Sequence, residues 1–335
     1  MAFLRLVKCT LIVFVLVLAG CGGGGGGSVT STANTPTPTP LSTSTPEPTL
    51  EPTAEPTPEP TLEPTPEPNP LNVSGTAAKG LVLGGVVTIH PVVNGVVDTG
   101  LVLGSGTTDA NGRYSVTISD YDGGPFFVVI SAAADGTTSM RCDLADGCGD
   151  GSQFGGSLAL SPGNFELQAI VSPTLEDDVL VNISLLTGTV AAVAVNALQN
   201  SGGTSTAAVT EAVANANAEV AGRFGVANSG DLTELPIIDL TNPSDFLFVS
   251  DNDVAYNLLN AAVVEALMAD DDTLTVDIAV QRFYEQYVNN GGLADTEVVD
   301  STAVTLAEIL TEASDLIDVI ELEAQDVNLN LGALE

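Results

Sequence analysis

The sequence has no tryptophan, a single histidine and few cations. Seven lysines and arginines stand against 43 aspartates and glutamates, which gives a formal net charge of -36. A polyanion of this size repels phosphate backbones, so nucleic acid is excluded as a partner. We expect the acidity to serve solubility in a salty medium, and attraction of cations or basic partners is the alternative. Only Tyr121 is predicted to be an exposed loop aromatic of the kind that binds sugars.

Common catalytic motifs are also missing. The chain contains no GxSxG, HExxH or GxxxxGK[ST] motif and no complete EF-hand spacing. His90 lies at the end of a predicted strand, next to Pro91, and is expected to be structural. We therefore predict that the protein is not an enzyme and name no catalytic residue. A hydrolase that acts on envelope or extracellular polymers through carboxylates is the competing class, but acid pairs are too numerous to single one out.

The first residues are typical of a secretory signal. Met1 to Lys8 carries two cations and no acid, and Leu11 to Leu18 is an apolar run too short to cross a membrane. The run ends in Leu18-Ala19-Gly20-Cys21, which resembles the lipobox of bacterial lipoproteins. The resemblance implies cleavage before Cys21, lipidation of its thiol and, with Gly22 in second place, residence in the outer membrane or at the cell surface. An ordinary signal peptide with an incidental cysteine is the alternative.

A low-complexity segment follows, from residue 21 to residue 70. It opens with six glycines, Gly22 to Gly27, and Thr35 to Pro70 holds 13 of the 19 prolines. The nine residues Thr45 to Thr53 recur as Thr57 to Thr65. This composition cannot bury enough apolar surface to fold and favours extended polyproline II, at roughly 3.1 Å per residue. The segment is predicted to be a disordered stalk.

Residues 71–171 are predicted to form an all-β module. Short runs rich in valine, isoleucine, phenylalanine and tyrosine alternate there with glycine and Asx turns. The expected strands are Leu81 to His90, Val96 to Gly104, Arg113 to Ser119, Phe126 to Ala132 and Phe165 to Val171.

One segment of this module resembles a known family. Val73-Ser74-Gly75-Thr76, the run Val86 to Ile89 and then Thr107-Thr108-Asp109-Ala110-Asn111-Gly112-Arg113-Tyr114-Ser115 follow the order found in carboxypeptidase-regulatory-like, transthyretin-like β-sandwiches. In physical terms, Asp109 and Asn111 cap a tight turn, Gly112 takes a positive φ and Tyr114 points inward. The resemblance implies a non-catalytic spacer or binding module.

Two cysteines remain in the module once Cys21 is lipidated and Cys9 leaves with the signal. We expect Cys142 and Cys148 to form a disulfide in an oxidising compartment, and a zinc site is the alternative. Asp143, Asp146 and Asp150 lie in the same glycine-rich loop. These three could bind calcium, and a solvated acidic loop is the alternative. No other cofactor is expected.

Beyond residue 172 the apolar period changes from two to 3.6, which predicts an all-α helical bundle. Ser250 and Asp253 are expected to form a capping box. The expected helices are Leu186 to Leu198, Ala207 to Phe224, Val254 to Leu267, Val276 to Val288 and Val304 to Ile320.

The sequence thus predicts a multidomain β + α protein. A signal peptide at 1–20 and a stalk at 21–70 precede a β-sandwich at 71–171 and an α-helical domain at 172–335. We expect a non-catalytic cell-surface lipoprotein, held to the membrane by its lipid anchor, that binds an unidentified protein or polysaccharide or acts as an envelope scaffold. A calcium-stabilised adhesin is a further alternative.

Overall fold

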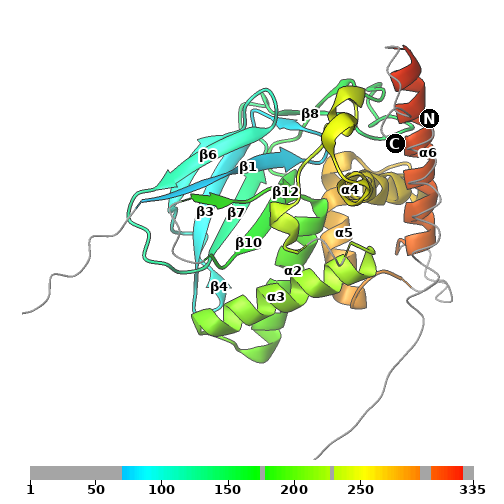
Figure 1. The fold of residues 1–335 in the computed structure, drawn as a ribbon. Coiled ribbons are helices and arrows are strands. Elements are labelled where there is room, and N and C mark those ends of the chain that lie inside the picture. Colours follow the sequence, from blue (N-terminus) through cyan, green and yellow to red (C-terminus); the bar gives the residue numbers. More distant parts are fainter. Residues whose placement is uncertain (1–69, 174–177, 227–229, 295–302, 327–335) are drawn as a thin grey trace, which may run out of the picture. The chain divides into compact units, whose positions relative to one another are not determined.

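The computed structural model describes residues 70–173, 178–226, 230–294 and 303–326. A β-rich region comes first and a helical region follows (Figure 1). All the described residues belong to one compact unit, Pro68–Glu335. The predicted signal peptide, Cys21 and the proline-rich segment as far as residue 69 lie outside the described residues.

The first sheet is built around β1 (Leu71–Ala78). This strand runs antiparallel to β6 (Arg113–Ile118) and parallel to two short strands, β11 (Asp178–Leu180) and β12 (Ile183–Ser184). Alternate residues of β6 are buried, among them Tyr114, as expected for a strand with one face on the core. The parallel pairing brings chain from beyond residue 172 into the sheet, so strand pairing crosses the predicted boundary between the β and α domains.

The second sheet has the order β10-β7-β3-β4, and β5 also pairs with β3. A third, small sheet has the order β2-β8-β9. Every pair in these two sheets is antiparallel. The strands are β10 (Glu166–Val171), β7 (Phe126–Ser131), β3 (Val86–Val93), β4 (Val96–Val97), β5 (Gly104–Thr107), β2 (Val82–Leu83), β8 (Ser139–Arg141) and β9 (Ser157–Ala159).

The predicted turn before β6 is confirmed for Asp109, Gly112 and Tyr114. Asp109 Oδ1 accepts the backbone N–H groups of Asn111 at 2.7 Å and of Arg113 at 2.9 Å, and Gly112 has a φ of +71°. The two N–H groups hold the pKa of Asp109 below its usual value, because they stabilise the carboxylate. Tyr114 then points inward, and its hydroxyl donates to the carbonyl of Val181 at 2.5 Å.

Two expected strands are not continuous. Leu81 to His90 is divided, since β2 ends at Leu83 and β3 begins at Val86, and Gly84 between them has a φ of +67°. Val96 to Gly104 is not continuous, since β4 ends at Val97 and β5 begins at Gly104. Asp98 turns the chain between them, because its Oδ1 accepts the N–H of Gly100 at 3.1 Å. An Asx turn of this kind competes with strand pairing.

The five expected helices are all present, and their ends lie within six residues of the expected ones. They are α2 (Leu185–Ser201), α3 (Thr206–Arg223), α4 (Asp251–Asp270), α5 (Val276–Asn290) and α6 (Leu306–Asp326), with two short 3-10 helices, η1 (Leu232–Glu234) and η2 (Pro243–Phe248). The capping box of Ser250 and Asp253 at the start of α4 is confirmed. None of the described helices combines the length and the apolar character that crossing a membrane requires.

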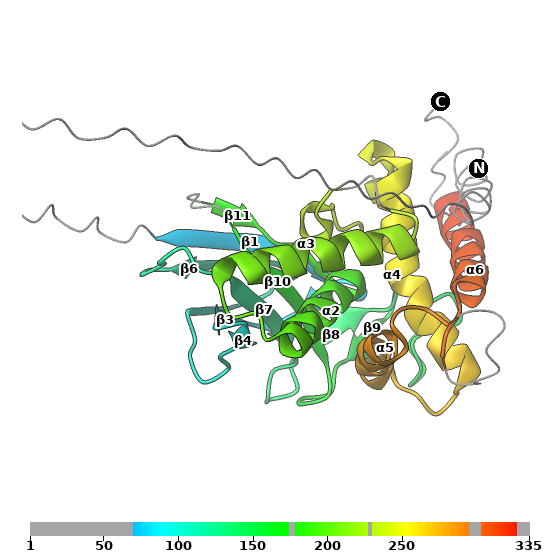
Figure 2. The same ribbon diagram turned by 90° about the horizontal axis from the view of Figure 1, so that it is seen from below.

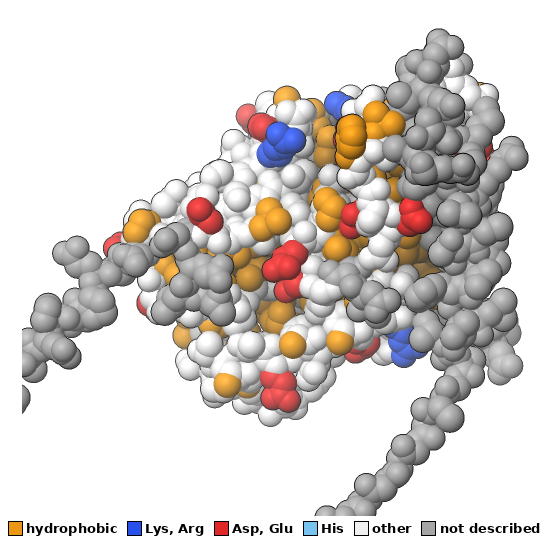
Figure 3. Space-filling model, in the orientation of Figure 1, with side chains coloured by type: hydrophobic (Ala, Val, Ile, Leu, Met, Phe, Trp, Pro, Cys, Tyr) orange, Lys and Arg blue, Asp and Glu red, His pale blue; other side chains and the backbone are white. Residues whose placement is uncertain are grey.

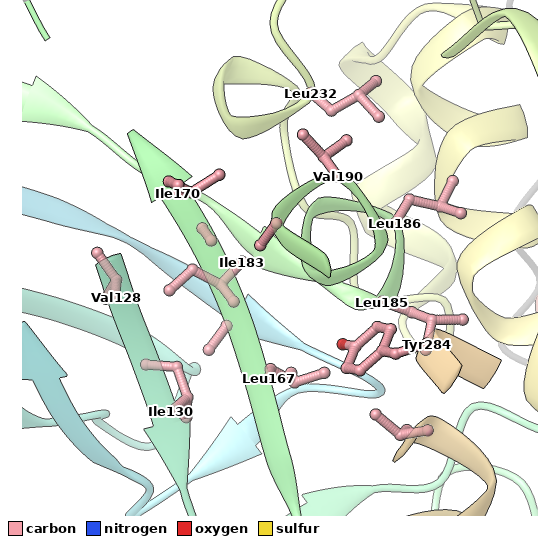
Figure 4. Close-up of a cluster of buried hydrophobic side chains, with 14 of the residues drawn as sticks. Val128, Ile130, Leu167, Ile170, Ile183, Leu185, Leu186, Val190, Leu232 and Tyr284 are labelled. Atoms are coloured by element: carbon pink, nitrogen blue, oxygen red, sulfur yellow. The ribbon is translucent and has the colours of Figure 1, made fainter. Parts of the chain in front are cut away.

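Helix α2 joins the two regions. It contacts β10 and β12 on one side and α3 and α5 on the other (Figures 1 and 2). Figure 4 shows the buried aliphatic side chains of β7 and β10 facing those of α2, with Tyr284 of α5 beside them. One hydrophobic cluster therefore spans both regions, and a smaller cluster lies between η2, α4 and α6. The β and helical regions are packed as one body.

Candidate functional site

The best-defined chemical feature of the described residues is the loop closed by the disulfide, Cys142–Cys148, which follows β8. The two sulfur atoms lie 2.15 Å apart and the two Cα atoms 5.7 Å apart, so the expected disulfide is present. Both cysteines are buried. We call residues 142–148 the disulfide loop.

Asp143 of this loop pairs with a buried cation. Its Oδ1 lies 2.6 Å from Nζ of Lys79, and its Oδ2 accepts the backbone N–H of Gly80 at 2.7 Å. The Lys79 side chain is completely buried and that of Asp143 is 8% exposed. Burying two charges is costly unless they are paired and hydrogen-bonded, and this pair meets both conditions.

Gly80 allows this approach. Its φ is +56°, and a Cβ built on it would lie 1.7 Å from the carbonyl oxygen of Arg141. Only glycine fits such a conformation at such a short distance. The end of β1 therefore lies directly against the end of β8, and this contact sets Lys79 opposite Asp143.

The three aspartates that were expected to bind calcium have different surroundings. Asp143 is buried and bonded to Lys79, whereas Asp146 and Asp150 are exposed. Both oxygens of Asp143 already have donors within the protein. Among the residues that the structure describes, no group of three or more His, Cys, Asp or Glu side chains is arranged to hold a metal ion.

Glu265 of α4 approaches the same loop from the helical region. Its Oε1 accepts the backbone N–H of Asp146 at 2.8 Å, while its Oε2 has no hydrogen-bond partner among the described residues. Burial raises the pKa of Glu265 to about 7. The N–H of Asp146 and the charge of Lys79 lower this pKa, and Glu312 raises it. The residue is only 4% exposed, and this burial disfavours the charged form of its carboxyl.

A small cavity adjoins the ion pair. It measures about 20 Å³, and its lining includes Gly80, Asp143, Ser184, Asp239 and Asn260. A water molecule needs about 10–15 Å³ on this measure, so the cavity has room for one. A site of this size cannot admit a polymer.

The polar side chains around the cavity bind other parts of the protein. The guanidinium of Arg141 pairs with Oδ2 of Asp239. Asn260 accepts the N–H of Leu186 at 2.9 Å, and the hydroxyl of Ser184 lies 2.7 Å from that of Tyr256. The last two contacts tie the start of α2 to α4 within the helical region, whereas the pair of Arg141 with Asp239 joins β8 to the helical region.

Two other residues considered from the sequence have structural roles. His90 is buried, and its Nδ1 lies 2.8 Å from the carbonyl oxygen of Leu101. Tyr121 is 6% exposed and donates to the carbonyl of Gly124, so the expectation of an exposed loop aromatic is wrong. It packs edge-on against Phe126 in the core. Tyr121 therefore offers no platform for a sugar ring.

Sequence reasoning missed Lys79 and Glu265. The chain has two lysines, Lys8 and Lys79, and the second stands in an apolar run, Ala77-Ala78-Lys79-Gly80-Leu81-Val82. A lone cation among apolar residues in so acidic a chain is a signal for a buried pair. Glu265 has a similar signal, since it interrupts the apolar run from Ala261 to Leu267.

Comparisons of the chain with protein-family models, with curated proteins and with solved structures find no match. Its function is therefore argued from its own residues. On the face drawn in Figure 3, cationic side chains are few and acidic side chains are scattered over the described residues. Three of the five cations beyond residue 20 pair with aspartates, namely Lys79, Arg141 and Arg282.

Proposed function

We propose that the protein is a non-catalytic lipoprotein of the bacterial cell surface, a binding or scaffold module held away from the membrane by residues 21–70. The main support is the single hydrophobic cluster that spans the β and helical regions. A body of this kind moves as one piece, which suits a display module. Its partner would be a protein or polysaccharide with basic groups, because the charge of the chain repels anions.

We further propose that the β region is the transthyretin-like sandwich that the sequence resembles. The Asp109 turn and the inward Tyr114 support this assignment. The contact of β5 with β6 also supports it, because it brings the first and second sheets together.

The hydrolase alternative has less support. Glu265 has a pKa suited to proton transfer, but it is 4% exposed and the neighbouring cavity holds about 20 Å³. A general acid must reach the bond that breaks, and a polymer cannot reach this carboxyl.

The proposal is tested by replacing Cys21 and measuring where the chain is found in the cell. In a bacterial host, we expect the wild-type chain in the membrane fraction and accessible to a protease added to intact cells. The Cys21→Ser chain should be soluble, because it cannot receive acyl chains. Cys9→Ser is the matched control and should partition like the wild type. Equal partition of the Cys21→Ser and wild-type chains would contradict the lipid anchor.

A binding role is tested separately with immobilised polylysine as a basic probe. We expect salt-sensitive retention of the full chain, since screening weakens attraction between exposed charges. Failure to bind, or binding that is unchanged at high salt, would contradict a basic partner.

A further inference from the structure

We propose that Lys79 and Asp143 join to each other in the folded protein, through an amide bond between Nζ of Lys79 and Cγ of Asp143. The bond is an intramolecular cross-link that the chain makes by itself. The proposal stands on the contacts of the pair and is independent of the proposed function.

The reacting groups are already in place. Nζ of Lys79 lies 2.6 Å from Oδ1 of Asp143, and the carbon it would attack is one bond further. Because the two groups are held in place, the reaction needs no bimolecular encounter. This lowers the activation free energy of amide formation by a large part. The two sides of the pair are held independently. Lys79 is fixed by β1 and Gly80, and Asp143 by the disulfide next to it.

The step balances without any other reactant. The ammonium of Lys79 passes a proton to Oδ1 along their hydrogen bond, which leaves an amine and a carboxylic acid. The amine nitrogen attacks Cγ, the C–Oδ1 bond breaks, and Oδ1 leaves as water with a second proton from the nitrogen. An ammonium and a carboxylate are thereby converted into one amide and one water.

Two features of the site favour this step. The backbone N–H of Gly80 donates to Oδ2 at 2.7 Å, so it stabilises the negative charge that develops on that oxygen during attack. In the product, the same N–H donates to the oxygen of the amide. The cavity next to Asp143 has room for one water, which is the leaving group. Burial favours the product, because a neutral amide replaces two charges in a dry interior.

Glu265 has a positioning role. Its carboxyl holds the disulfide loop through the N–H of Asp146. Burial raises its pKa to about 7, Glu312 raises it further, and the charge of Lys79 lowers it. The contact that gives Glu265 its role is the one with the N–H of Asp146.

The composition of the chain allows a sharp test. Beyond residue 20, Lys79 is the only lysine. The full chain is purified, reduced and denatured, and then treated with an endoproteinase that cleaves only after lysine. We expect no cleavage between Lys79 and Gly80, because an acylated lysine is not recognised. Peptides from a second protease should include a branched species lighter than its two components by the mass of one water.

The matched variants are Asp143→Ala and Asp146→Ala, two acids of the same loop. Asp143→Ala should make the bond after Lys79 fully cleavable, and this readout works on a denatured chain whether or not the variant folds. Asp146→Ala should resist cleavage like the wild type. Cleavage of the denatured wild-type chain to the same extent as the Asp143→Ala chain would overturn the cross-link.

The role of Glu265 has its own readout, the extent of cross-linking in chains produced under the same conditions. Glu265→Gln keeps an oxygen acceptor for the N–H of Asp146 and should resist cleavage after Lys79 like the wild type. Glu265→Ala removes this acceptor, so a larger fraction of its chains should be cleaved. Equal resistance of the Glu265→Ala and wild-type chains would overturn the role given to Glu265.

Discussion

Asp143 of the β region and two acids of the helical region, Glu265 and Asp277, are buried in opposite ways. In the β region, Lys79 and Asp143 neutralise each other as a hydrogen-bonded pair. In the helical region, Glu265 and Asp277 face loops of the β region without a cation bonded to them.

Each of these two acids accepts one backbone N–H, from Asp146 or from Ser161, and each keeps one oxygen without a partner among the described residues. Burial raises the pKa of both acids. The comparison teaches that Asp143 relies on a counter-charge, while Glu265 and Asp277 have no bonded cation and their burial makes the stability of the protein sensitive to pH.

The largest effect should come from removing the counter-charge. Lys79→Met leaves Asp143 buried and unpaired, which costs about 3–5 kcal/mol. Chemical denaturation at pH 7 measures the loss. Arg282→Met is the matched control, because its pair with Asp271 is partly exposed and such pairs contribute little to stability. Equal losses in the two variants would show that burial does not distinguish these ion pairs.

The second effect concerns the protonation of Glu265. The folded-state pKa of Glu265 is raised from 4.5 to about 7, so the stability from its protonation is fully present below pH 4.5 and is lost as the pH rises through about 7. Glu265→Gln removes this dependence. We expect it to be more stable than the wild type by about 3 kcal/mol at pH 8, and to differ little at pH 4. Denaturation curves at the two pH values measure the difference, and a constant offset between the proteins would contradict it.

A smaller effect is expected from the disulfide. Opening a loop this short, with a sequence separation of 6, releases limited chain entropy, so the double variant Cys142→Ser, Cys148→Ser should lose about 2 kcal/mol. Thermal unfolding of the variant and of the wild type, without reductant, measures this loss. A loss as large as that of Lys79→Met would mean that the disulfide acts chiefly by holding Asp143 against Lys79.

The smallest effect is expected from calcium. Both oxygens of Asp143 have donors within the protein, so added calcium should find only the exposed Asp146 of the disulfide loop and Asp150 just beyond it. We expect the unfolding temperature to respond equally to calcium and magnesium, through screening alone. A saturable increase with calcium only, lost in Asp146→Asn, would support the calcium-stabilised adhesin.

Local patterns predicted the helical region well. The 3.6-residue period located all five helices, and the capping box at Ser250 is a signal contained within four residues. Strands were harder to predict. The strands β8, β9, β11 and β12 have two or three residues each, and they exist because they pair with distant partners. A period cannot be detected in so short a segment.

Contacts between distant residues were even harder to predict at the candidate site. The pairing of Cys142 with Cys148 was predictable because the two residues are close in sequence. Lys79 and Asp143 are 64 positions apart, and Glu265 reaches Asp146 from 119 positions away. The contacts of Asp143 depend on how β1, β8 and α4 pack together, and no pattern within one segment encodes that packing. The loop was therefore predicted to bind calcium, whereas in the structure the cation beside Asp143 is Lys79.

Strand β1 also determines how the folded part would respond to a pull. In a protein held at Cys21, tension enters at Leu71, the first residue of β1, and runs along a strand flanked by β6 and β11. Lys79 comes directly after the last residue of that strand. With an amide bond there, force reaching the end of β1 would pass straight into the chain at Asp143. The mechanical strength of the attachment would then depend on a covalent bond, and residues 80–142 would be shielded from the load.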